Sequence, residues 1–548
     1  MRSAEGTATP ARAPGPRVLI VGAGPAGLAL AIELGHRGVP CVVIERNDRV
    51  GYAPRAKTTN VRTREHLRRW GIADKLRAAS PLGLDYPSNV TFITRLSGYG
   101  ITRFENALYC APGRNPLYSE HAQWIPQYAL EEVLRAHAQS LPGVEIRFNC
   151  ELVSYQQDAD GVRARVNDLA RSSEFEVASD YLVGADGARS TVRKLIGAEM
   201  TGVHGLSRNY NIIFRAPGLA AAHQHGPAIM YWQINAEVPS IIGPMDRDDI
   251  WFFMPMQLPE GIQITPEEAP ALIARATGID LDYQVLSSDQ WTASRLIADR
   301  YRDRRVFLAG DACHLHPPFG GFGMNMGIGD AVDLGWKMAA RLCGWGGESL
   351  LGSYQAERRK VHERTIAEAV LNFGSTANQL VRPGLEEPGL IGEATRHEVA
   401  DIIYATKIRE FRTLGIVLGQ RYDNSPIIVP DGSEPPPDHF MLYVPSAHPG
   451  CLAPHLWLAD GSSLYDHFGD GFTLLVTDGD PRDADDLCAA AARHKVPLTV
   501  LAPADTRLRA RYEARFALIR PDQHVGWRGD SFPPDKNALI ARLTGAGH

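Results

Sequence analysis

Residues 18–45 read VLIVGAGPAGLALAIELGHRGVPCVVIE, and this stretch decides the fold. An apolar run, a glycine turn, a segment with helical apolar spacing and a second apolar run follow one another. This order predicts a βαβ unit with strands at 18–21 and 41–44 and a helix at 25–34. The stretch therefore predicts a Rossmann-like unit at the start of an α/β protein.

The glycine turn has the spacing G-x-G-x-x-G, which suits a bound pyrophosphate. Gly22 permits the tight turn, Gly24 lets the backbone approach the phosphates, and Gly27 lets the helix pack closely on the strand. Pro25 suits the first helical turn, whose free N–H groups attract an anion. Glu45 ends the second strand, where its carboxylate can accept hydrogen bonds from ribose hydroxyls. The turn predicts a dinucleotide but does not distinguish FAD from NAD.

Two later segments also place an aspartate at the end of a predicted strand. The first, YLVGADGARSTVRKLIG at 181–197, delivers Asp186. The second, VFLAGDACHLHPPFGGFGMNMGIGDAVDLGWKMA at 306–339, delivers Asp311 ahead of a loop rich in glycine and proline. In a parallel sheet the carboxyl ends of all three strands meet in one crevice. These segments therefore extend the predicted site beyond the glycine turn.

The three motifs, in this order, resemble those of the class A flavoprotein monooxygenases, the para-hydroxybenzoate and phenol hydroxylase family, which includes hydroxylases of aromatic natural products. The resemblance spans about residues 17–545. It implies that Asp311 binds the FAD ribityl chain, that Asp186 lies near the pyrophosphate, and that the loop at 317–325 lines the isoalloxazine ring. The FAD contacts implied by the glycine turn and the resemblance together are Gly22, Gly24, Pro25, Ala26, Gly27, Glu45, Arg46, Arg55, Gln127, Val153, Asp186, Gly187, Gly310, Asp311, Pro318, Gly321, Gly323, Met324 and Asn325.

The resemblance also implies a reaction. NADH or NADPH would reduce the FAD, O2 would form a flavin C4a-hydroperoxide, and an electron-rich aromatic ring of a phenol, a hydroxypyridine or an aromatic polyketide would be hydroxylated. The sequence has no second strand-framed glycine turn, so no separate domain is expected for the nicotinamide cofactor. Baeyer-Villiger oxidation or oxidative decarboxylation on the same fold, and a non-catalytic flavin-binding protein, stay open as alternatives. No residue is assigned as the catalytic acid or base.

Between residues 205 and 288, β-branched and aromatic runs separated by turn residues predict an inserted antiparallel sheet that binds the substrate. In the run DIWFFMPM, period two puts Trp251 and Phe253 on one face and Phe252 on the other. The candidate substrate contacts are Phe214, Tyr231, Trp232, Trp251, Phe253, Pro318 and Phe319. For each aromatic side chain the alternative is a place in the hydrophobic core.

The predicted architecture is a Rossmann-like FAD-binding domain, an inserted antiparallel β-sheet substrate domain and a C-terminal thioredoxin-like α/β domain. The predicted bounds are 1–16 for a disordered tail, 17–90, 111–204 and 289–375 for the FAD-binding domain, 91–110 and 205–288 for the substrate domain, 376–424 for a helical linker region, and 425–548 for the C-terminal domain. The last resembles the thioredoxin-like domain of phenol hydroxylases but has no Cys-x-x-Cys motif. Its expected role is therefore structural or dimeric rather than redox.

Composition narrows the class of partner. The 548-residue chain has 44% hydrophobic residues and a formal charge of −6. It shows no basic cluster for nucleic acid and no apolar run long enough to span a membrane, so a small aromatic molecule is the expected partner. A homodimer or a higher homo-oligomer stays open. The seven scattered cysteines favour free thiols in a reducing cytoplasm over a disulfide framework.

His314 and His316 lie just before the 317–325 loop and invite a metal interpretation. No cluster of acidic or cysteine ligands accompanies them in the sequence, so no metal site is predicted. Packing or hydrogen bonding beside the loop is the expected role of both residues.

Overall fold

The computed structural model describes residues 15–48, 56–256, 263–374 and 377–547. Its centre is a six-stranded sheet with the order β17-β18-β11-β1-β2-β7, in which all neighbours run parallel except β17 and β18. The strand bounds are β1 Val18–Val21, β2 Cys41–Ile44, β7 Val144–Arg147, β11 Tyr181–Gly184, β17 Arg302–Asp303 and β18 Val306–Leu308. The predicted βαβ unit is confirmed, with α1 (Pro25–His36) joining β1 to β2.

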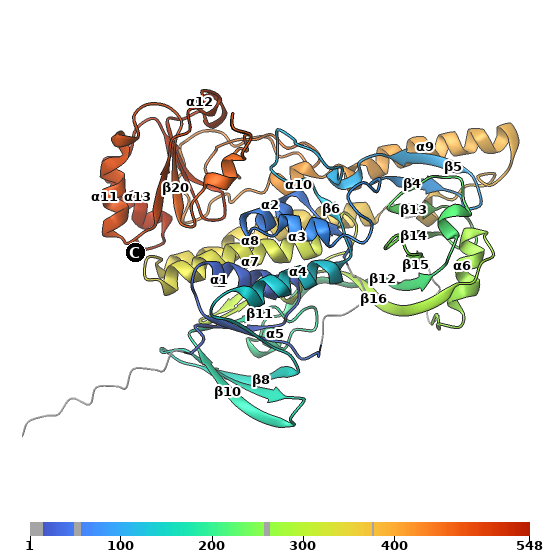
Figure 1. Ribbon diagram of the computed structural model, residues 1–548, viewed down its shortest axis with the longest axis horizontal. Coiled ribbons are helices and arrows are strands. Elements are labelled where there is room, and N and C mark those ends of the chain that lie inside the picture. Colours follow the sequence, from blue (N-terminus) through green and yellow to red (C-terminus); the bar gives the residue numbers. More distant parts are fainter. Residues whose placement is uncertain (1–14, 49–55, 257–262, 375–376, 548) are drawn as a thin grey trace, which may run out of the picture.

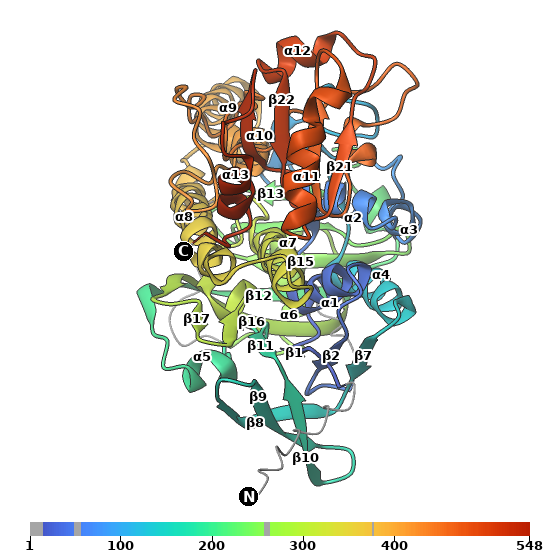
Figure 2. The same ribbon diagram turned by 90° about the vertical axis from the view of Figure 1, so that its left-hand side faces the viewer.

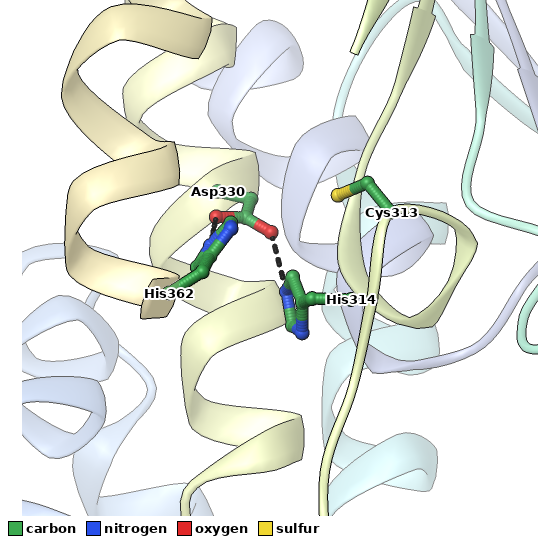
Figure 3. Close-up of side chains that lie close together, drawn as sticks. All are labelled: Cys313, His314, Asp330 and His362. Carbon is green, nitrogen blue, oxygen red and sulfur yellow. Dashed lines mark hydrogen bonds and ion pairs between the residues drawn. The ribbon is translucent and has the colours of Figure 1, made fainter. Parts of the chain in front are cut away.

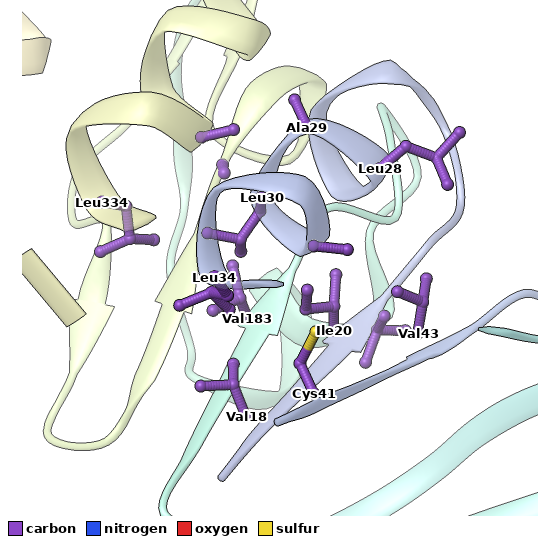
Figure 4. Packing of buried hydrophobic residues seen from close by; sticks show 14 of the residues in the cluster. Val18, Ile20, Leu28, Ala29, Leu30, Leu34, Cys41, Val43, Val183 and Leu334 are labelled. Atoms are coloured by element: carbon purple, nitrogen blue, oxygen red, sulfur yellow. The ribbon is translucent and has the colours of Figure 1, made fainter. Parts of the chain in front are cut away.

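Helices cover this sheet and form the α/β domain (Figure 1). α1 packs against both α7 (Gly323–Leu342) and α4 (Gln127–Ser140). Because α1 is enclosed between these helices and the sheet, it needs no polar face, and its Leu28 and Leu30 are 1% and 0% exposed. Both side chains belong to the same apolar cluster as Ile20 of β1 (Figure 4).

Two smaller sheets and four further helices complete the α/β domain. β3 (Thr58–Thr59) pairs with β6 (Gln123–Trp124), and β8, β9 and β10 form an antiparallel sheet that contacts β1. The bounds of these three strands are β8 Cys150–Gln157, β9 Val162–Asp168 and β10 Ser173–Ser179. The further helices are α2 Val61–Arg69, α3 Ala73–Ala78, α5 Thr191–Leu195 and α8 Glu348–Phe373.

An eight-stranded sheet has the order β19-β16-β12-β15-β14-β13-β4-β5. Its strands are β4 Val90–Ile93, β5 Gly100–Phe104, β12 Met200–Arg215, β13 Met230–Gln233, β14 Ser240–Pro244, β15 Ile250–Pro255, β16 Gln284–Ala298 and β19 His314–Leu315. All neighbours are antiparallel, as predicted, except β13 and β4. β12 begins at Met200 and β16 ends at Ala298, so the sheet extends beyond the predicted range 205–288.

Different helices cover the two faces of the eight-stranded sheet. α6 (Ala269–Thr277) packs on one face as part of its buried cluster. α9 (Gly389–Phe411) lies on the other face beside β4 and β5 (Figure 1), where the rings of Phe104 and Phe411 have centroids 5.0 Å apart. The central strands β13, β14 and β15 are therefore largely buried on both sides, whereas β12 and β16 carry many exposed residues.

The C-terminal domain has a four-stranded sheet with the order β21-β20-β22-β23. β20 runs parallel to β21 and antiparallel to β22, in the predicted thioredoxin-like arrangement. The elements are β20 Phe472–Val476, β21 Leu498–Leu501, β22 Phe516–Ile519, β23 Val525–Gly529, α11 Asp485–Arg493, α12 Arg507–Tyr512 and α13 Lys536–Leu543, preceded by α10 Leu414–Leu418. Figure 2 shows this domain at the end of the molecule opposite the β8–β10 sheet.

A buried network of charges joins the C-terminal domain to α7 and α8. Arg520 forms ion pairs with Glu357 (2.7 Å), Asp522 (2.6 Å) and Asp333 (3.2 Å). Lys337 lies between Asp333 (2.8 Å) and Glu357 (2.6 Å). All five side chains are at most 3% exposed. The domain is therefore docked through a network of ionisable groups that are buried from water.

Two properties of the whole chain complete the description. None of the described helices is both long enough and apolar enough to cross a membrane. All seven cysteines carry free thiols, and only Cys343 is fully exposed.

Candidate functional site

The glycine turn between β1 and α1 forms the first part of the site. Gly22 has a φ of +107°, and a Cβ there would lie 2.4 Å from the carbonyl oxygen of Ala185. A Cβ at Gly27 would lie 1.9 Å from the carbonyl oxygen of Gly22. At Gly24, by contrast, no atom of the described chain lies within 4 Å of such a Cβ. Gly22 and Gly27 therefore let the chain pack on itself, whereas Gly24 leaves open space for a ligand.

The start of α1 is suited to an anion. Its N-cap residue Gly24 offers no side-chain hydrogen bond, and Pro25 occupies the first turn. One carboxylate oxygen of Glu45 accepts from Ala23 N (2.9 Å), and the other accepts from Asn47 N (3.0 Å). Free N–H groups at a helix start bind phosphate, and a carboxylate at the end of β2 binds ribose hydroxyls. The arrangement fits the nucleotide half of FAD.

The Gly310 turn lies directly beside α1. Gly310 has a φ of +63°, and a Cβ there would lie 3.1 Å from Cβ of Ala26 and 3.7 Å from Cα of Gly327. Its N–H donates a hydrogen bond to Asp330 Oδ2 (3.1 Å). Asp311 follows it and is exposed. The turn is thus held against α1 and α7, in the position from which Asp311 is expected to reach the ribityl chain.

Asp330 is the centre of a buried network that fixes this turn (Figure 3). Its carboxylate accepts hydrogen bonds from His314 Nε2 (3.0 Å), His362 Nε2 (2.7 Å) and Arg358 Nε (2.8 Å). All four side chains are at most 2% exposed. Burial alone would raise the pKa of this carboxyl, but Arg358 and the two histidine hydrogen bonds outweigh burial and hold the pKa of Asp330 well below its usual value. Asp330 is therefore ionised at neutral pH.

Four residues with metal-ligating side chains meet here, with their ligand atoms within 4.8 Å of one another: Cys313, His314, Asp330 and His362. The sequence did not predict this cluster, because α7 and α8 bring Asp330 and His362 to His314 from distant positions. The guanidinium of Arg358 already binds the carboxylate, and the Cys313 thiol donates to the carbonyl oxygen of Gly310 (3.3 Å). A bound cation would compete with Arg358, so we interpret the cluster as a hydrogen-bond network that positions the Gly310 turn.

Asp186 and Gly187 follow β11, the neighbour of β1 in the sheet. The carboxylate of Asp186 accepts hydrogen bonds from Ser190 Oγ and from the backbone N–H groups of Thr191 (2.7 Å) and Val192 (3.1 Å). Gly187 has a φ of +78°, and a Cβ there would meet nothing within 4 Å among the residues placed. Asp186 thus caps α5, while Gly187 leaves open space beside the glycine turn.

Asn325 ties the 317–325 loop to β3 and α2. Its Oδ1 accepts from Asn60 N (2.9 Å), and its Nδ2 donates to the carbonyl oxygens of Thr58 (2.9 Å) and Gly321 (2.7 Å). A Cβ at Gly321, which has a φ of +66°, would lie 3.1 Å from Cβ of Thr58. Asn325 therefore shapes the loop through its side chain.

α7 begins at Gly323 without a side-chain cap, because its N-cap residue Phe322 has no hydrogen-bonding group. The N–H groups of the first turn, including those of Gly323 and Met324, have no partners within the helix. Pro318 is exposed, and Met324 is half-buried. A helix start of this kind stabilises negative charge, which fits the oxygen-bearing edge of a flavin ring.

Four other predicted contacts lie at the margin of this region. Arg46 follows β2 and is exposed. Arg55 lies outside the described residues. Gln127 accepts a hydrogen bond from Ala56 N (3.1 Å) and so links α4 to the segment before β3. Val153 is half-buried at a register shift between β8 and β9. The role of these positions toward FAD stays a prediction.

The eight-stranded sheet divides the predicted substrate contacts between its two faces. The face under α6 holds Phe214, Tyr231, Trp251 and Phe253. The other face holds Trp232, and Phe319 of the loop reaches it, with 6.1 Å between the two ring centroids. The first four side chains are core residues between the sheet and α6, so the structure does not support them as substrate contacts. The alternation of side chains along each strand separates the two faces of the sheet. Only the positions of α6 and the 317–325 loop show which of these faces meets the loop.

Two lysines border the aromatic face that meets the loop. Lys57 Nζ lies 4.3 Å from the ring centroid of Phe252, and Lys407 Nζ lies 4.4 Å from that of Trp232. Lys407 also forms an ion pair with Glu410 (2.8 Å). The sequence predictions included neither lysine. The place of Lys407 among the apolar residues of α9 could have marked it as a buried cation, whereas nothing in the sequence marks Lys57.

Known proteins share this architecture. Residues 16–369 match the family model described as FAD binding domain, and residues 446–546 match the one described as aromatic-ring hydroxylase, C-terminal. A putative polyketide hydroxylase of Streptomyces halstedii is 32% identical over 556 residues, which cover 94% of each chain. A structure of the rebeccamycin biosynthetic enzyme RebC with reduced flavin is 34% identical, has a TM-score of 0.90 and covers 97% of this chain and 99% of that chain. A complex of aklavinone-11 hydroxylase with FAD and aklavinone is 29% identical, has a TM-score of 0.81 and covers 96% and 98%.

Proposed function

Since the chain belongs to the family of FAD-dependent aromatic-ring hydroxylases, we propose that it hydroxylates an electron-rich aromatic ring at the face of the eight-stranded sheet that meets the 317–325 loop. The contact between Phe319 and Trp232, 6.1 Å between ring centroids, carries the proposal. It joins the loop expected to line the flavin to a cluster of aromatic rings beside which a flat substrate can bind.

The residues of the crevice fit FAD. Gly24 leaves space at the start of α1 for the pyrophosphate, and Glu45 offers a carboxylate to the ribose. Asp311 is exposed beside the fixed Gly310 turn, and the start of α7 presents N–H groups to the ring edge. When bound, FAD supplies the chemistry that couples oxidation of NADH or NADPH to the activation of O2.

The residues of the chain itself orient the substrate and exclude water. Trp232 and Phe252 are 0% and 1% exposed, and Ile241 between their strands is 4% exposed. These buried apolar side chains keep water away from the region beside the loop in which the substrate ring would react. The Asp330 network keeps the Gly310 turn, and with it Asp311, in one position.

Turnover with identified products tests the proposal. Purified protein is supplied with NADH or NADPH and with phenols, hydroxypyridines and aromatic polyketides, while nicotinamide oxidation and product mass are followed. We expect at least one ring to gain a single oxygen atom with no carbon–carbon bond cleaved. Gly24→Asp is the matched control, because its carboxylate would repel the pyrophosphate and abolish both flavin binding and turnover. Nicotinamide oxidation without any oxygenated product contradicts the proposal.

We also propose that the protein acts in the cytoplasm on a small aromatic molecule. The free thiols of all seven cysteines support a reducing compartment. Cysteine labelling of freshly isolated protein without reductant tests this, since a fraction of oxidised thiols at isolation would argue against it.

A further inference from the structure

Lys57 lies where the 317–325 loop, α4 and the eight-stranded sheet meet. Ala56, before it, donates its N–H to a side chain of α4 (3.1 Å). Thr58, after it, accepts a hydrogen bond from Asn325 Nδ2 (2.9 Å) through its carbonyl oxygen. The backbone at Lys57 is therefore held on both sides, and on one side by the residue that shapes the loop.

The side chain of Lys57 is directed at the aromatic face of the sheet. Its Nζ lies 4.3 Å from the ring centroid of Phe252, which is 1% exposed. Trp124 of β6 is a neighbour of the same ring, with 6.4 Å between centroids. Phe252 belongs to one buried cluster with Trp232 and Phe319. The ammonium group therefore borders the surface on which we place the substrate.

Lys57 differs from the two fully buried lysines in its lack of a counter-ion. Lys337 pairs with Asp333 and Glu357, and Lys407 pairs with Glu410. Within the part of the chain that the structure describes, Lys57 Nζ has neither an ion-pair partner nor a hydrogen-bond acceptor. The face of an aromatic ring compensates an ammonium group only in part. The surroundings of Lys57 therefore favour the arrival of an anion.

Desolvation of Lys57 also favours the binding of an anion beside it. Burial lowers the pKa of Lys57 to about 8, which leaves the group positively charged at neutral pH. A negative oxygen next to Nζ would offset the lost hydration of the ammonium. Phe252 offers the half-buried Lys57 an aromatic face, so a matching ligand carries its charge on a ring substituent.

We propose that Lys57 binds the ionised hydroxyl oxygen of the aromatic substrate and so holds the ring as a phenolate beside the 317–325 loop. This assignment rests on the hydroxylase function proposed above. The phenol O–H bond breaks on binding, its proton passes to water, and Lys57 keeps its own proton and its charge. A phenol ionises near pH 10 in water, so a fixed ammonium favours the ionised form at neutral pH. The ionised oxygen makes the ring richer in electrons, which favours transfer of an oxygen atom to it.

Lys407 borders the same face but is not equivalent. Its Nζ donates to Glu410 Oε2 (2.8 Å) and to the carbonyl oxygen of Asn372 (3.1 Å), so its charge is already compensated. It also lies over Trp232 rather than Phe252. Of these two lysines, Lys57 is therefore the one that can select the end of the substrate at which the negative oxygen is held.

A dye that reports its own ionisation tests the assignment on the full-length, FAD-loaded protein. The visible spectrum of 1,2-dihydroxyanthraquinone changes when a ring hydroxyl ionises. We expect the wild-type protein to bind this dye as its anion at a pH at which the free dye is neutral. Lys57→Met should weaken binding about 10- to 100-fold and return the bound dye to its neutral spectrum. Lys57→Arg keeps a positive charge and should preserve the anion spectrum.

Three controls separate charge recognition from changes in the fold. Lys75→Met, at an exposed lysine of α3, should bind the dye like the wild type. The dimethyl ether of the dye cannot ionise and should bind equally to the wild type and to Lys57→Met. Flavin absorbance should show the same FAD content in every variant. An anion spectrum that persists in Lys57→Met, or an equal loss of affinity for the dye and its ether, overturns the assignment.

The dye experiment needs no turnover, so it can fail separately from the proposed function. If Lys57→Met hydroxylates a ring as fast as the wild type, the Lys57 assignment is wrong and the proposed function stands. If the wild type binds the dye anion through Lys57 but oxygenates no ring, the proposed function is wrong. Anthraquinone-2-carboxylate is the final ligand to compare. A loss of affinity in Lys57→Met for this carboxylate but not for the dye would overturn the phenolate assignment.

Discussion

Two buried polar networks lie next to each other along α7, and they connect different parts of the molecule. All partners of Asp330 belong to the α/β domain, and the network ends on the N–H of Gly310. Asp333, on the next turn of the helix, belongs to the network that reaches Arg520 of the C-terminal domain. One helix therefore supports the flavin site with one carboxylate and the domain contact with another.

The balance of charge differs between the two networks. Asp330 is surrounded by donors, and its pKa is held well below its usual value even though burial opposes this. In the second network, three carboxylates face Lys337 and Arg520, and burial raises the pKa of Asp333 to about 8. Asp333 therefore carries a proton at neutral pH, whereas Asp330 does not. The Asp330 carboxylate therefore stays ionised through the neutral range, whereas the proton on Asp333 is lost as the pH rises through about 8.

The substitution Arg520→Met should have the largest effect, because it leaves buried carboxylates without their guanidinium. We expect the free energy of unfolding to fall by about 3–5 kcal/mol. Denaturant unfolding followed by tryptophan fluorescence measures this change. Arg482→Met, at a surface arginine whose side chain is 84% exposed, is the control and should leave the unfolding curve unchanged. If both variants unfold alike, the network does not hold the domain in place.

The substitution Asp330→Asn should act on the flavin site instead. It removes the charge that Arg358 binds and weakens the hydrogen bond to Gly310 N. We expect FAD to bind about 10- to 100-fold more weakly, since hydrogen bonds to charged groups contribute about 1.5–3 kcal/mol. Titration of the apoprotein with FAD, followed by flavin fluorescence, gives the affinity. Asp333→Asn, on the neighbouring turn, should keep the wild-type affinity, and an equal loss in both variants would erase the distinction between the networks.

Alkaline pH should have the smallest effect, and it should act on the docking network alone. The folded pKa of Asp333 lies above its unfolded value, so protonation stabilises the fold at low pH and this contribution is lost as the pH rises through about 8. From pH 7 to pH 9 the wild type should lose about 1.4 kcal/mol in total relative to Asp333→Asn, because the loss builds up between the unfolded pKa of the carboxyl and about 8 and then levels off. Unfolding of both proteins at pH 7 and pH 9 measures the difference, and parallel curves would contradict it. Lys57 and the other titrating groups are present in both proteins, so their contributions to the pH dependence cancel in the comparison.

The sequence predicts the parts of this site that depend on local chain geometry. Gly22 and Gly27 follow from the tight turn and from close packing, and the structure places a backbone oxygen where each Cβ would lie. The strands β1, β11 and β18 also follow, because each predicted strand ends in a recognisable turn. The glycine turn and the strand ends depend mainly on residues nearby in the sequence, so they can be predicted without the fold.

Features that depend on contacts between distant elements were not predicted. His362 and Arg358 reach Asp330 only because α8 packs on α7, and no spacing in the sequence records that contact. The aromatic residues show a related limit. The alternation of side chains along the strand puts Tyr231 and Trp232 on opposite faces of the sheet. Which face packs on α6 and which on α9 follows only from where these helices lie. Lys57 has no sequence signal, because a single lysine near a glycine-rich site is usually solvated.

The cover that α9 forms over the aromatic face has a consequence for synthesis of the chain. The strands that carry Trp232 and Phe252 are complete once residue 298 has been made, whereas α9 begins only at Gly389. A chain growing from its N-terminus therefore carries an uncovered aromatic sheet while the residues in between are still being translated. Surfaces of this kind attract chaperones and promote aggregation. The aromatic face is thus exposed on the nascent polypeptide at first, and translation of the last third of the chain covers it.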